Sequence, residues 1–239
     1  MIVTKPYARL LAFDQDGNQE EFTRRHGIGL LRKIEWNARI SHRTEDAQTP
    51  DSWERFVSTV VMSRGDWSVV EHASVTVDAL IDRGISHEWV RHRLFSFTQS
   101  STRFINHVKK MPPEFIQPEG LTDDAARASN GEQVELSQLQ LWRHAINTSE
   151  SVYRQLIAIG VAPQIARSVF PNALSTRITT TGNLRNWRHF CIMRTTKEAH
   201  PQMREVAIPL LQEFKTKVPL VFDDIEPLQR QADNLRLPQ

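Results

Sequence analysis

The chain has 239 residues, of which 39% are hydrophobic and 24% are charged, which is ordinary for a globular protein with a sizeable core. Its formal net charge of only +2 argues against nucleic acid or an anionic membrane as a partner. The single cysteine, Cys191, excludes an intramolecular disulfide and a cysteine-cluster metal site. The sequence has no signal-peptide pattern and no apolar run of membrane-spanning length, so we expect a cytoplasmic protein without a membrane partner.

Apolar periodicity and turn residues predict a chain in which helices and strands are mixed. In chain order we expect a strand or hairpin arm (1–13), helices over 20–39 and 50–65, a strand over 71–82, a short helix over 85–95, a surface loop over 111–131, a long helix over 132–160, a shorter helix over 162–170, a strand over 175–181, helices over 183–193 and 200–217, and a loose tail over 225–239. No regular βαβ repeat is visible. The pattern therefore indicates the α/β class with α+β-like mixed packing, in a single domain over residues 1–239.

The stretch from Arg91 to Arg103 is the strongest functional signal. It holds three arginines, one histidine and five hydroxyl residues, and it contains no acidic residue. The planar fork of an arginine suits phosphate better than a flexible lysine does. A charged surface segment is the simpler alternative, but Phe95 and Phe97 lie in the middle of the stretch and disfavour it. We interpret the stretch as the wall of a pocket that holds phosphate.

Two separated basic segments suggest one shared anionic ligand. Residues 83–110 contain six Lys and Arg against Glu88, and residues 164–204 contain seven against Glu198. No glycine-rich phosphate loop, no metal-binding His-Glu-x-x-His motif and no serine-hydrolase elbow accompany them. We therefore predict no metal site and a ligand that is held mainly by arginine side chains.

Arg91-His92-Arg93, followed after seven residues by Ser101, resembles the signature of the flavin-dependent thymidylate synthases. Further segments resemble motifs of the same family in the same order, and together they span roughly residues 38–210: Gly65–His72, Arg167–Pro171, Gly182–Arg185 and His189–Arg194. The resemblance implies that the chain converts dUMP to dTMP, with carbon from methylenetetrahydrofolate, FAD as hydride carrier and NADPH as reductant. It also implies that family's fold, a small sheet flanked by long helices, and a homotetramer with active sites at subunit interfaces.

The resemblance also assigns site residues. FAD is expected at Ser68, Arg91, His92, Arg93, Gln99, Asn183, Leu184, Arg185 and His189. The nucleotide dUMP is expected at Glu88, Arg91, Gln99, Ser100, Ser101, Thr102, Arg103, Arg167 and Arg194. Arg194 is the expected catalytic residue, because a guanidinium at the pyrimidine N3/O2 edge would stabilise the negative charge that develops there. We expect the arginines of both segments to converge on one cavity.

Several positions differ from the family pattern. Thr98-Gln99 replaces a usual Asn-Glu, Asp66 replaces a histidine, and Glu88 and His189 stand where glutamine and asparagine are usual. These differences leave open a relative that produces a hydroxymethylated pyrimidine nucleotide. They also leave open a nucleotide-binding or RNA-binding relative without turnover.

Two side chains of the sequence could act as nucleophiles, Cys191 and Ser101. Cys191 could attack the pyrimidine as in classical thymidylate synthases, but its apolar neighbours Phe190 and Ile192 favour a buried core thiol. Ser101 has no base fixed beside it by the sequence, so a hydrogen-bonding role is favoured.

Overall fold

The computed structural model describes residues 1–13, 16–124 and 134–229, and its chain divides into two compact units. The first unit comprises residues 1–6, 80–88 and 99–177, and the second comprises 7–79, 89–98 and 178–239. The chain crosses between the units several times, and the expectation of a single domain stays a prediction. None of the described helices is both long and apolar enough to span a membrane.

Helices and strands alternate irregularly along the chain, which confirms the α/β class. The helices are α1 (Arg24–Ile40), α2 (Ser52–Phe56), α3 (Arg83–Trp89), α4 (Gln138–Ala158), α5 (Pro163–Ala166), α6 (Leu184–Arg194) and α7 (Pro201–Lys217). The strands are β1 (Ile2–Thr4), β2 (Tyr7–Phe13), β3 (Gln19–Glu21), β4 (Ser74–Asp82), β5 (Ser96–Gln99), β6 (Glu114–Ile116) and β7 (Ser175–Asn183). Short η segments are η1 (Glu45–Ala47), η2 (Val57–Ser63), η3 (Trp67–His72) and η4 (Arg167–Val169).

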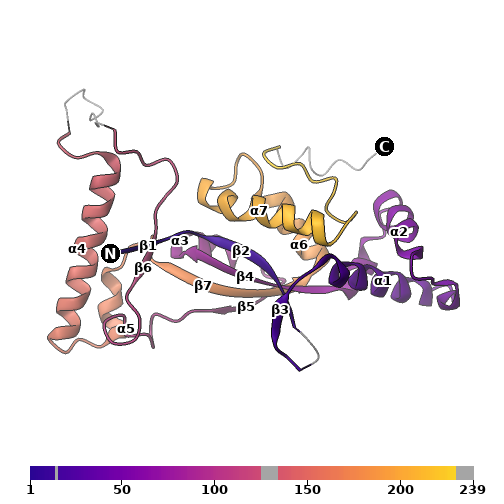
Figure 1. Cartoon of the computed structure of the whole chain (residues 1–239), viewed down its shortest axis with the longest axis horizontal. Coiled ribbons are helices and arrows are strands. Elements are labelled where there is room, and N and C mark those ends of the chain that lie inside the picture. Colours follow the sequence, from indigo (N-terminus) through magenta and orange to yellow (C-terminus); the bar gives the residue numbers. More distant parts are fainter. Residues whose placement is uncertain (14–15, 125–133, 230–239) are drawn as a thin grey trace. The chain divides into compact units, whose positions relative to one another are not determined.

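The second unit is built on a five-stranded sheet in the order β3-β2-β4-β7-β5, whose strands β4, β5 and β7 continue into the first unit. Strands β2 and β3 pair antiparallel with Leu11 opposite Glu21, so the expected hairpin arm is confirmed. Figure 1 shows α7 along one face of this sheet, next to α6. Phe214 and Phe222 stack there with ring centroids 4.4 Å apart, and Trp187 packs against Phe214.

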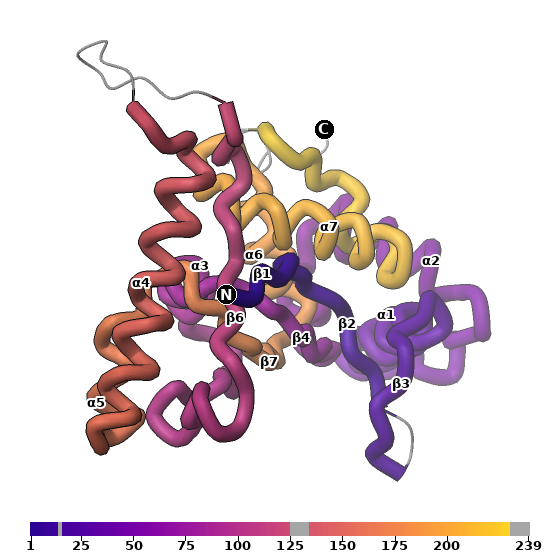
Figure 2. The backbone as a smooth tube through the Cα atoms, turned by 60° about the vertical axis from the view of Figure 1, so that its left-hand side comes forward, coloured from indigo at the N-terminus to yellow at the C-terminus, as the bar shows by residue number. Residues whose placement is uncertain are grey.

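The first unit contains a parallel pair of strands, β1 and β6, in which Val3 lies opposite Phe115. Helix α4 packs against α5, as Figures 1 and 2 both show, and it also contacts η4. Phe115, Ile146 and Leu174 form the buried cluster of this unit. The ring of Tyr153 stacks on that of Phe170 with their centroids 4.4 Å apart, and Phe170 packs against this cluster.

The expected helix over 85–95 is wrong in its second half. Helix α3 ends at Trp89, and after a turn the chain forms strand β5 from Ser96. Tertiary packing overrides the helical spacing there, because the ring of Phe95 lies against Trp187 at 4.5 Å and β5 adds to the sheet beside β7. Arg91 and Arg93 are therefore presented by a turn and not by a helix.

Three other boundaries differ from expectation. The helix expected over 20–39 begins at Arg24, since Glu20 belongs to β3, and the helix expected over 50–65 continues beyond α2 as the π-helical segment η2. The long helix begins at Gln138, where Ser137 accepts a hydrogen bond from the backbone N–H of Gln140. Residues 132–133, at the expected start of that helix, lie outside the described residues.

The two segments expected to be irregular contain ordered parts. The expected loop over 111–131 includes strand β6, whose Phe115 and Ile116 are buried; residues 125–131 lie outside the described residues. In the expected tail, Ile225 is buried and the N–H of Leu228 donates to the carbonyl of Thr195. The expectation of a loose tail is therefore wrong for residues 225–229, and residues 230–239 lie outside the described part of the chain.

Candidate functional site

A cavity of about 340 Å³ in the second unit lies between the turn after α3 and the helix α6. Five expected site residues meet there, together with four that were not expected: Arg91, His92, Arg93, His189 and Arg194, with Leu94, Phe95, Asn186 and Met193. Two separate parts of the sequence therefore supply one basic cavity.

Helix α6 positions its side of this cavity. Asn183 accepts a hydrogen bond from the N–H of Asn186 at 2.9 Å and so caps the helix. The spacing of three and four residues then places Asn186, His189 and Met193 on one face. The side chain of Asn186 also donates to the carbonyl of Leu94 at 3.0 Å, which ties the turn to the helix. Asn186 and Met193 could have been expected from this spacing alone.

His92 and Arg194 form the central contact of the cavity. Arg194 Nε donates a hydrogen bond to Nε2 of His92 at 2.9 Å, which requires a neutral imidazole with a free lone pair at Nε2. Burial lowers the pKa of His92 to about 4, with further lowering by the positive charge of Arg194 and by His189. His92 is therefore a neutral acceptor near pH 7 and orients the guanidinium of Arg194.

The cavity carries uncompensated positive charge. Among the described residues, neither Arg91 nor Arg93 forms an ion pair, and both are exposed. Guanidinium groups without carboxylate partners remain available for phosphate or carboxylate oxygens. Leu94 and Phe95 add apolar surface beside this charge. Such a combination suits a ligand that has both an anionic part and a flat apolar part.

The other expected cofactor residues of this unit lie elsewhere. Arg185 pairs with Glu71, and Leu184 is fully buried with its N–H bonded to the carbonyl of Ala73. A direct ligand contact by the Leu184 side chain is thus excluded, because that side chain belongs to the core. Ser68 lines a different cavity of the same unit, of about 580 Å³, together with Asp66, one of the positions that differ from the family pattern. Its polar wall also includes residues that the sequence did not indicate: Arg39, Ser41, His42 and Arg64.

In the first unit, a cavity of about 460 Å³ contains two of the expected nucleotide residues, Thr102 and Arg167. Arg167 Nη1 donates to Thr102 Oγ1 at 2.8 Å. The other wall residues were not expected: Arg83, His87, Gln164, Ser168, Phe170, Pro171, Asn172 and Leu174.

The remaining expected nucleotide residues of the first unit, apart from Glu88, take part in hydrogen bonds within that unit. Gln99 donates to the hydroxyls of Ser86 and Thr176 at 3.0 and 3.1 Å. Arg103 donates from Nε to Gln164 at 3.3 Å, and its N–H donates to Ser101 Oγ. The N–H of Ser100 donates to the carbonyl of Arg177, and Glu88 lies half-buried on α3. The convergence on one cavity of the five arginines assigned to the site stays a prediction: Arg91, Arg93, Arg103, Arg167 and Arg194.

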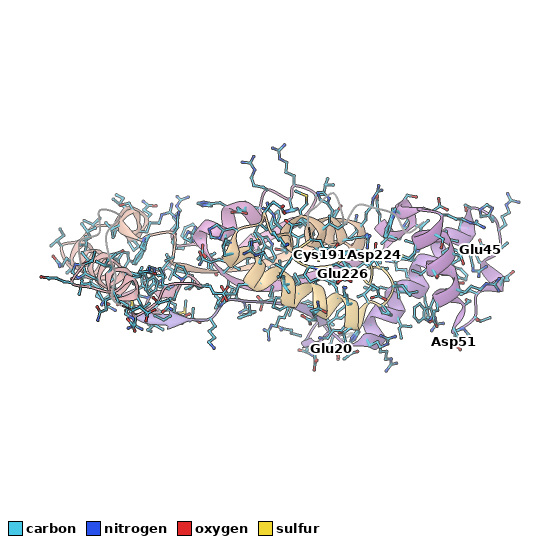
Figure 3. The ribbon with its side chains drawn as sticks, turned by 90° about the horizontal axis from the view of Figure 1, so that it is seen from above. Glu20, Glu45, Asp51, Cys191, Asp224 and Glu226 are labelled. Atoms are coloured by element: carbon cyan, nitrogen blue, oxygen red, sulfur yellow. The ribbon has the colours of Figure 1, made fainter. Side chains whose placement is uncertain are left out.

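Cys191 is a core thiol, as expected. Its side chain is fully buried in α6, and burial raises the pKa of the thiol far above its ordinary value. Figure 3 labels Cys191 and, close to it in that view, Asp224, whose carboxylate pairs with Arg188 of the same helix. A thiol that stays protonated and lies away from solvent is not a nucleophile.

Comparisons with known proteins point in one direction. The sequence profile of a family described as "Thymidylate synthase complementing protein" matches residues 29–220. A protein of Corynebacterium efficiens named "Flavin-dependent thymidylate synthase" is 33% identical over 218 residues, which cover 84% of this chain and 81% of the relative. Proteins with the same name from Mycobacterium sp. strain KMS and Mycobacterium tuberculosis are 39% and 35% identical, over 70% of this chain and 68% and 67% of theirs.

Proposed function

Because this chain belongs to the family of flavin-dependent thymidylate synthases, we propose that it converts dUMP to dTMP by reductive methylation. It is then a methyltransferase that takes its carbon from methylenetetrahydrofolate and its reducing equivalents from NADPH. FAD, when bound, supplies the hydride transfer between them. The observation that carries this proposal is the basic cavity in which Arg91, His92 and Arg93 meet Arg194.

The chain's own residues fit an anionic flavin nucleotide. We assign Arg91 and Arg93 to its phosphates, because neither is neutralised by a described carboxylate and each offers a planar set of donors. The remaining cofactor assignments stand as proposals: Ser68, His92, Gln99, Asn183, Leu184, Arg185 and His189. Leu184 as a whole is buried and its N–H is bonded to the carbonyl of Ala73, so its assignment has the least support of these.

Arg194 is assigned to catalysis. Its guanidinium would lie at the pyrimidine N3/O2 edge and stabilise the negative charge that increases electron density at C5. The hydrogen bond from Nε to His92 fixes the plane of the guanidinium before the substrate arrives, so little reorganisation is needed during the reaction. The other nucleotide assignments are Glu88, Arg91, Gln99, Ser100, Ser101, Thr102, Arg103 and Arg167.

We further propose a cytoplasmic homotetramer with active sites at subunit interfaces. Support for assembly comes from large apolar side chains at the surface, which cost free energy in water. Leu94, Phe104, Ile159 and Ile165 are 79%, 73%, 76% and 61% exposed. Light scattering coupled to size-exclusion chromatography would give the mass of the particle, and a monomer at assay concentration would contradict the proposal.

The visible absorption spectrum of the purified protein and the mass of the product from dUMP test the activity together. A bound flavin is expected, together with a product in which one hydrogen of dUMP is replaced by a methyl group, a gain of one CH2 unit. A product that carries a hydroxymethyl group would identify the hydroxymethylating alternative. Colourless protein that takes up no FAD, binds nucleotide or RNA and leaves dUMP unchanged would replace the enzyme with a binding protein.

A further inference from the structure

The chain that follows α7, residues 218–228, is here called the C-terminal segment, and it packs on the helices of the second unit. Val221, Phe222 and Ile225 are fully buried, and the ring of Phe222 stacks on that of Phe214 with centroids 4.4 Å apart. The match to the family profile ends near the start of this segment. A role for the rest of the segment is therefore not implied by that match.

Helix α6 meets the C-terminal segment with its rear face. Arg188, Cys191 and Thr195 recur at intervals of three and four residues, so they lie on one side of the helix. At 3.6 residues per turn, this side is roughly opposite the face that lines the basic cavity. The segment therefore supports α6 from behind the cavity.

A buried arginine joins the two elements. Arg188 donates from two nitrogens to the carboxylate of Asp224, and it also donates to the carbonyl of Val221 at 2.7 Å. Its guanidinium lies over the ring of Trp67, 4.5 Å from the centroid. A two-pronged pair between a guanidinium and a carboxylate has a defined geometry, so it fixes which part of the segment faces α6.

A second contact lies directly beside the expected catalytic residue. The N–H of Leu228 donates to the carbonyl of Thr195 at 2.7 Å, and Thr195 is the buried residue that follows Arg194 at the end of α6. The last carbonyls of a helix have no partner within the helix, and leaving a buried one unpaired is costly. Leu228 has a φ of 64°, which is uncommon for a residue other than glycine and needs support from the fold.

We propose that the C-terminal segment positions Arg194 for catalysis through the hydrogen bond from Leu228 to Thr195. The inference rests on the proposed function, which assigns catalysis to Arg194. His92 orients the guanidinium from within the cavity, and Leu228 fixes the backbone from which that side chain extends. Both ends of the Arg194 side chain are then held, and a displacement of about 1 Å can reduce a rate by about a hundredfold.

A double-mutant cycle tests the proposal by turnover of the FAD-loaded full chain with saturating dUMP, methylenetetrahydrofolate and NADPH. Leu228→Pro removes the N–H and cannot adopt a positive φ, so kcat should fall roughly tenfold to hundredfold. In the Arg194→Ala background the same substitution should change turnover by less than about twofold, because the group that it positions is gone. Leu228→Gly keeps the N–H, adopts a positive φ readily and should restore turnover.

The protonation of His92 gives a second readout, independent of turnover. Burial lowers its pKa to about 4, and the positive charge of Arg194 lowers it further than burial alone would. If Leu228→Pro displaces Arg194, the pKa of His92 should rise, because the neighbouring charge and its hydrogen bond are lost. NMR titration of the full chain with 13C-labelled histidine measures this change, and Leu228→Gly should titrate as the wild type does.

The outcomes separate this inference from the function on which it rests. An equal loss of turnover in both backgrounds would show that the segment only stabilises the fold. Turnover of Leu228→Pro within about twofold of the wild type would show that Arg194 is positioned without it. Either result overturns the inference and leaves the proposed function intact. If the wild-type protein makes no dTMP, the proposed function fails, and the titration decides: a raised pKa of His92 supports the positioning, and an unchanged one overturns it.

If Leu228→Pro does not fold, Asp224→Asn takes its place in the same cycle. It removes the charge that pairs with Arg188, whereas Glu226→Gln removes the same charge from an exposed position of the same segment, 3.7 Å from Lys215. Figure 3 labels both acidic residues. A loss for Asp224→Asn alone, and only with Arg194 present, supports the proposal. No loss, or an equal loss in both backgrounds, overturns it.

Discussion

At the scale of single residues, the hydrogen bond between Arg194 and His92 determines how the site can work. The imidazole accepts this bond only while it is neutral, and its burial keeps it neutral far below pH 7. One residue of the Arg-His-Arg motif thus accepts a hydrogen bond from the expected catalytic arginine. The sequence motif alone does not reveal this contact, since 102 positions separate the two residues.

Replacing Arg194 by alanine should reduce turnover by about two to three orders of magnitude, the usual effect of removing one group that stabilises developing charge. The flavin spectrum should remain, because Arg91 and Arg93 still offer their guanidinium groups to the cofactor. Product formation from dUMP under saturating cofactor measures the effect, with Arg143→Ala as the control. Normal turnover by Arg194→Ala would remove Arg194 from the catalytic role.

His92 should make the stability of the fold depend on pH in acid. Its pKa is about 4 in the folded protein against an ordinary value of 6.5, so between these pH values the unfolded chain binds a proton that the folded chain does not. The contribution of His92 to the free energy of unfolding is therefore constant above pH 6.5, and it decreases as the pH falls toward 4. Urea unfolding at several pH values should show a smaller decrease for His92→Gln than for the wild type.

The effect of His92 on stability in acid can be separated from the effects of other histidines. The pKa of His107 is also lowered, mainly by burial, so it contributes a decrease of the same sign that remains in the variant. His144→Gln, at an exposed position on α4, provides the matched control and should follow the wild-type curve. Parallel curves for His92→Gln and the wild type would show that His92 is not held neutral by the fold.

At the scale of elements, the contact of α1 with the end of α7 depends on a missing side chain. A Cβ atom built on Gly27 would lie 1.7 Å from the carbonyl oxygen of Lys217, whereas one on Gly29 of the same helix meets nothing within 4 Å. Helix α1 can approach α7 only because position 27 has no side chain. The apolar periodicity of α1 does not show which of its glycines is required.

This contact predicts opposite effects for two similar substitutions. Gly27→Ala should decrease the free energy of unfolding by about 1–3 kcal/mol or more, because the backbone of α7 must move away. Gly29→Ala should increase it by roughly 0.5–1 kcal/mol, since alanine is the better residue in a helix interior. Chemical denaturation of both variants measures the difference, and equal changes would contradict the close approach.

At the scale of the whole molecule, three strands run through both units. Strands β4, β5 and β7 each begin in one unit and end in the other, so the hydrogen-bonded ladder cannot be lost in one unit alone. We therefore predict one cooperative unfolding transition, as for a single domain. The unfolding curve followed by far-UV circular dichroism should coincide with the curve followed by tryptophan fluorescence.

Trp142 allows this prediction to be tested unit by unit. It packs on the cluster of Phe115, Ile146 and Leu174 in the first unit, whereas the other tryptophans belong to the second. The part of the fluorescence change on unfolding that is present in the wild type and absent from Trp142→Phe reports on the first unit. Separate midpoints for that signal and for the remaining fluorescence would indicate two domains that unfold independently.

The sequence by itself determined the elements whose signals are local. The helices α6 and α7, the strand β7 and the β2–β3 hairpin follow from caps, prolines, turn residues and apolar spacing, which act over a few residues. The family resemblance predicted a set of site residues, and of these the structure brings Arg91, His92, Arg93, His189 and Arg194 to one cavity.

Only the tertiary structure decided the features that depend on contacts between distant residues. Phe95 packs on Trp187 and strand β5 joins the sheet, which ends the helix that residues 85–95 would favour alone. The hydrogen bond from Arg194 to His92 arises in the same way, as does the burial of Arg83 Nη1 without an acceptor in the described part of the chain. Hydrogen bonds and burial of this kind depend on which surfaces meet after folding, and no local preference of the chain specifies them.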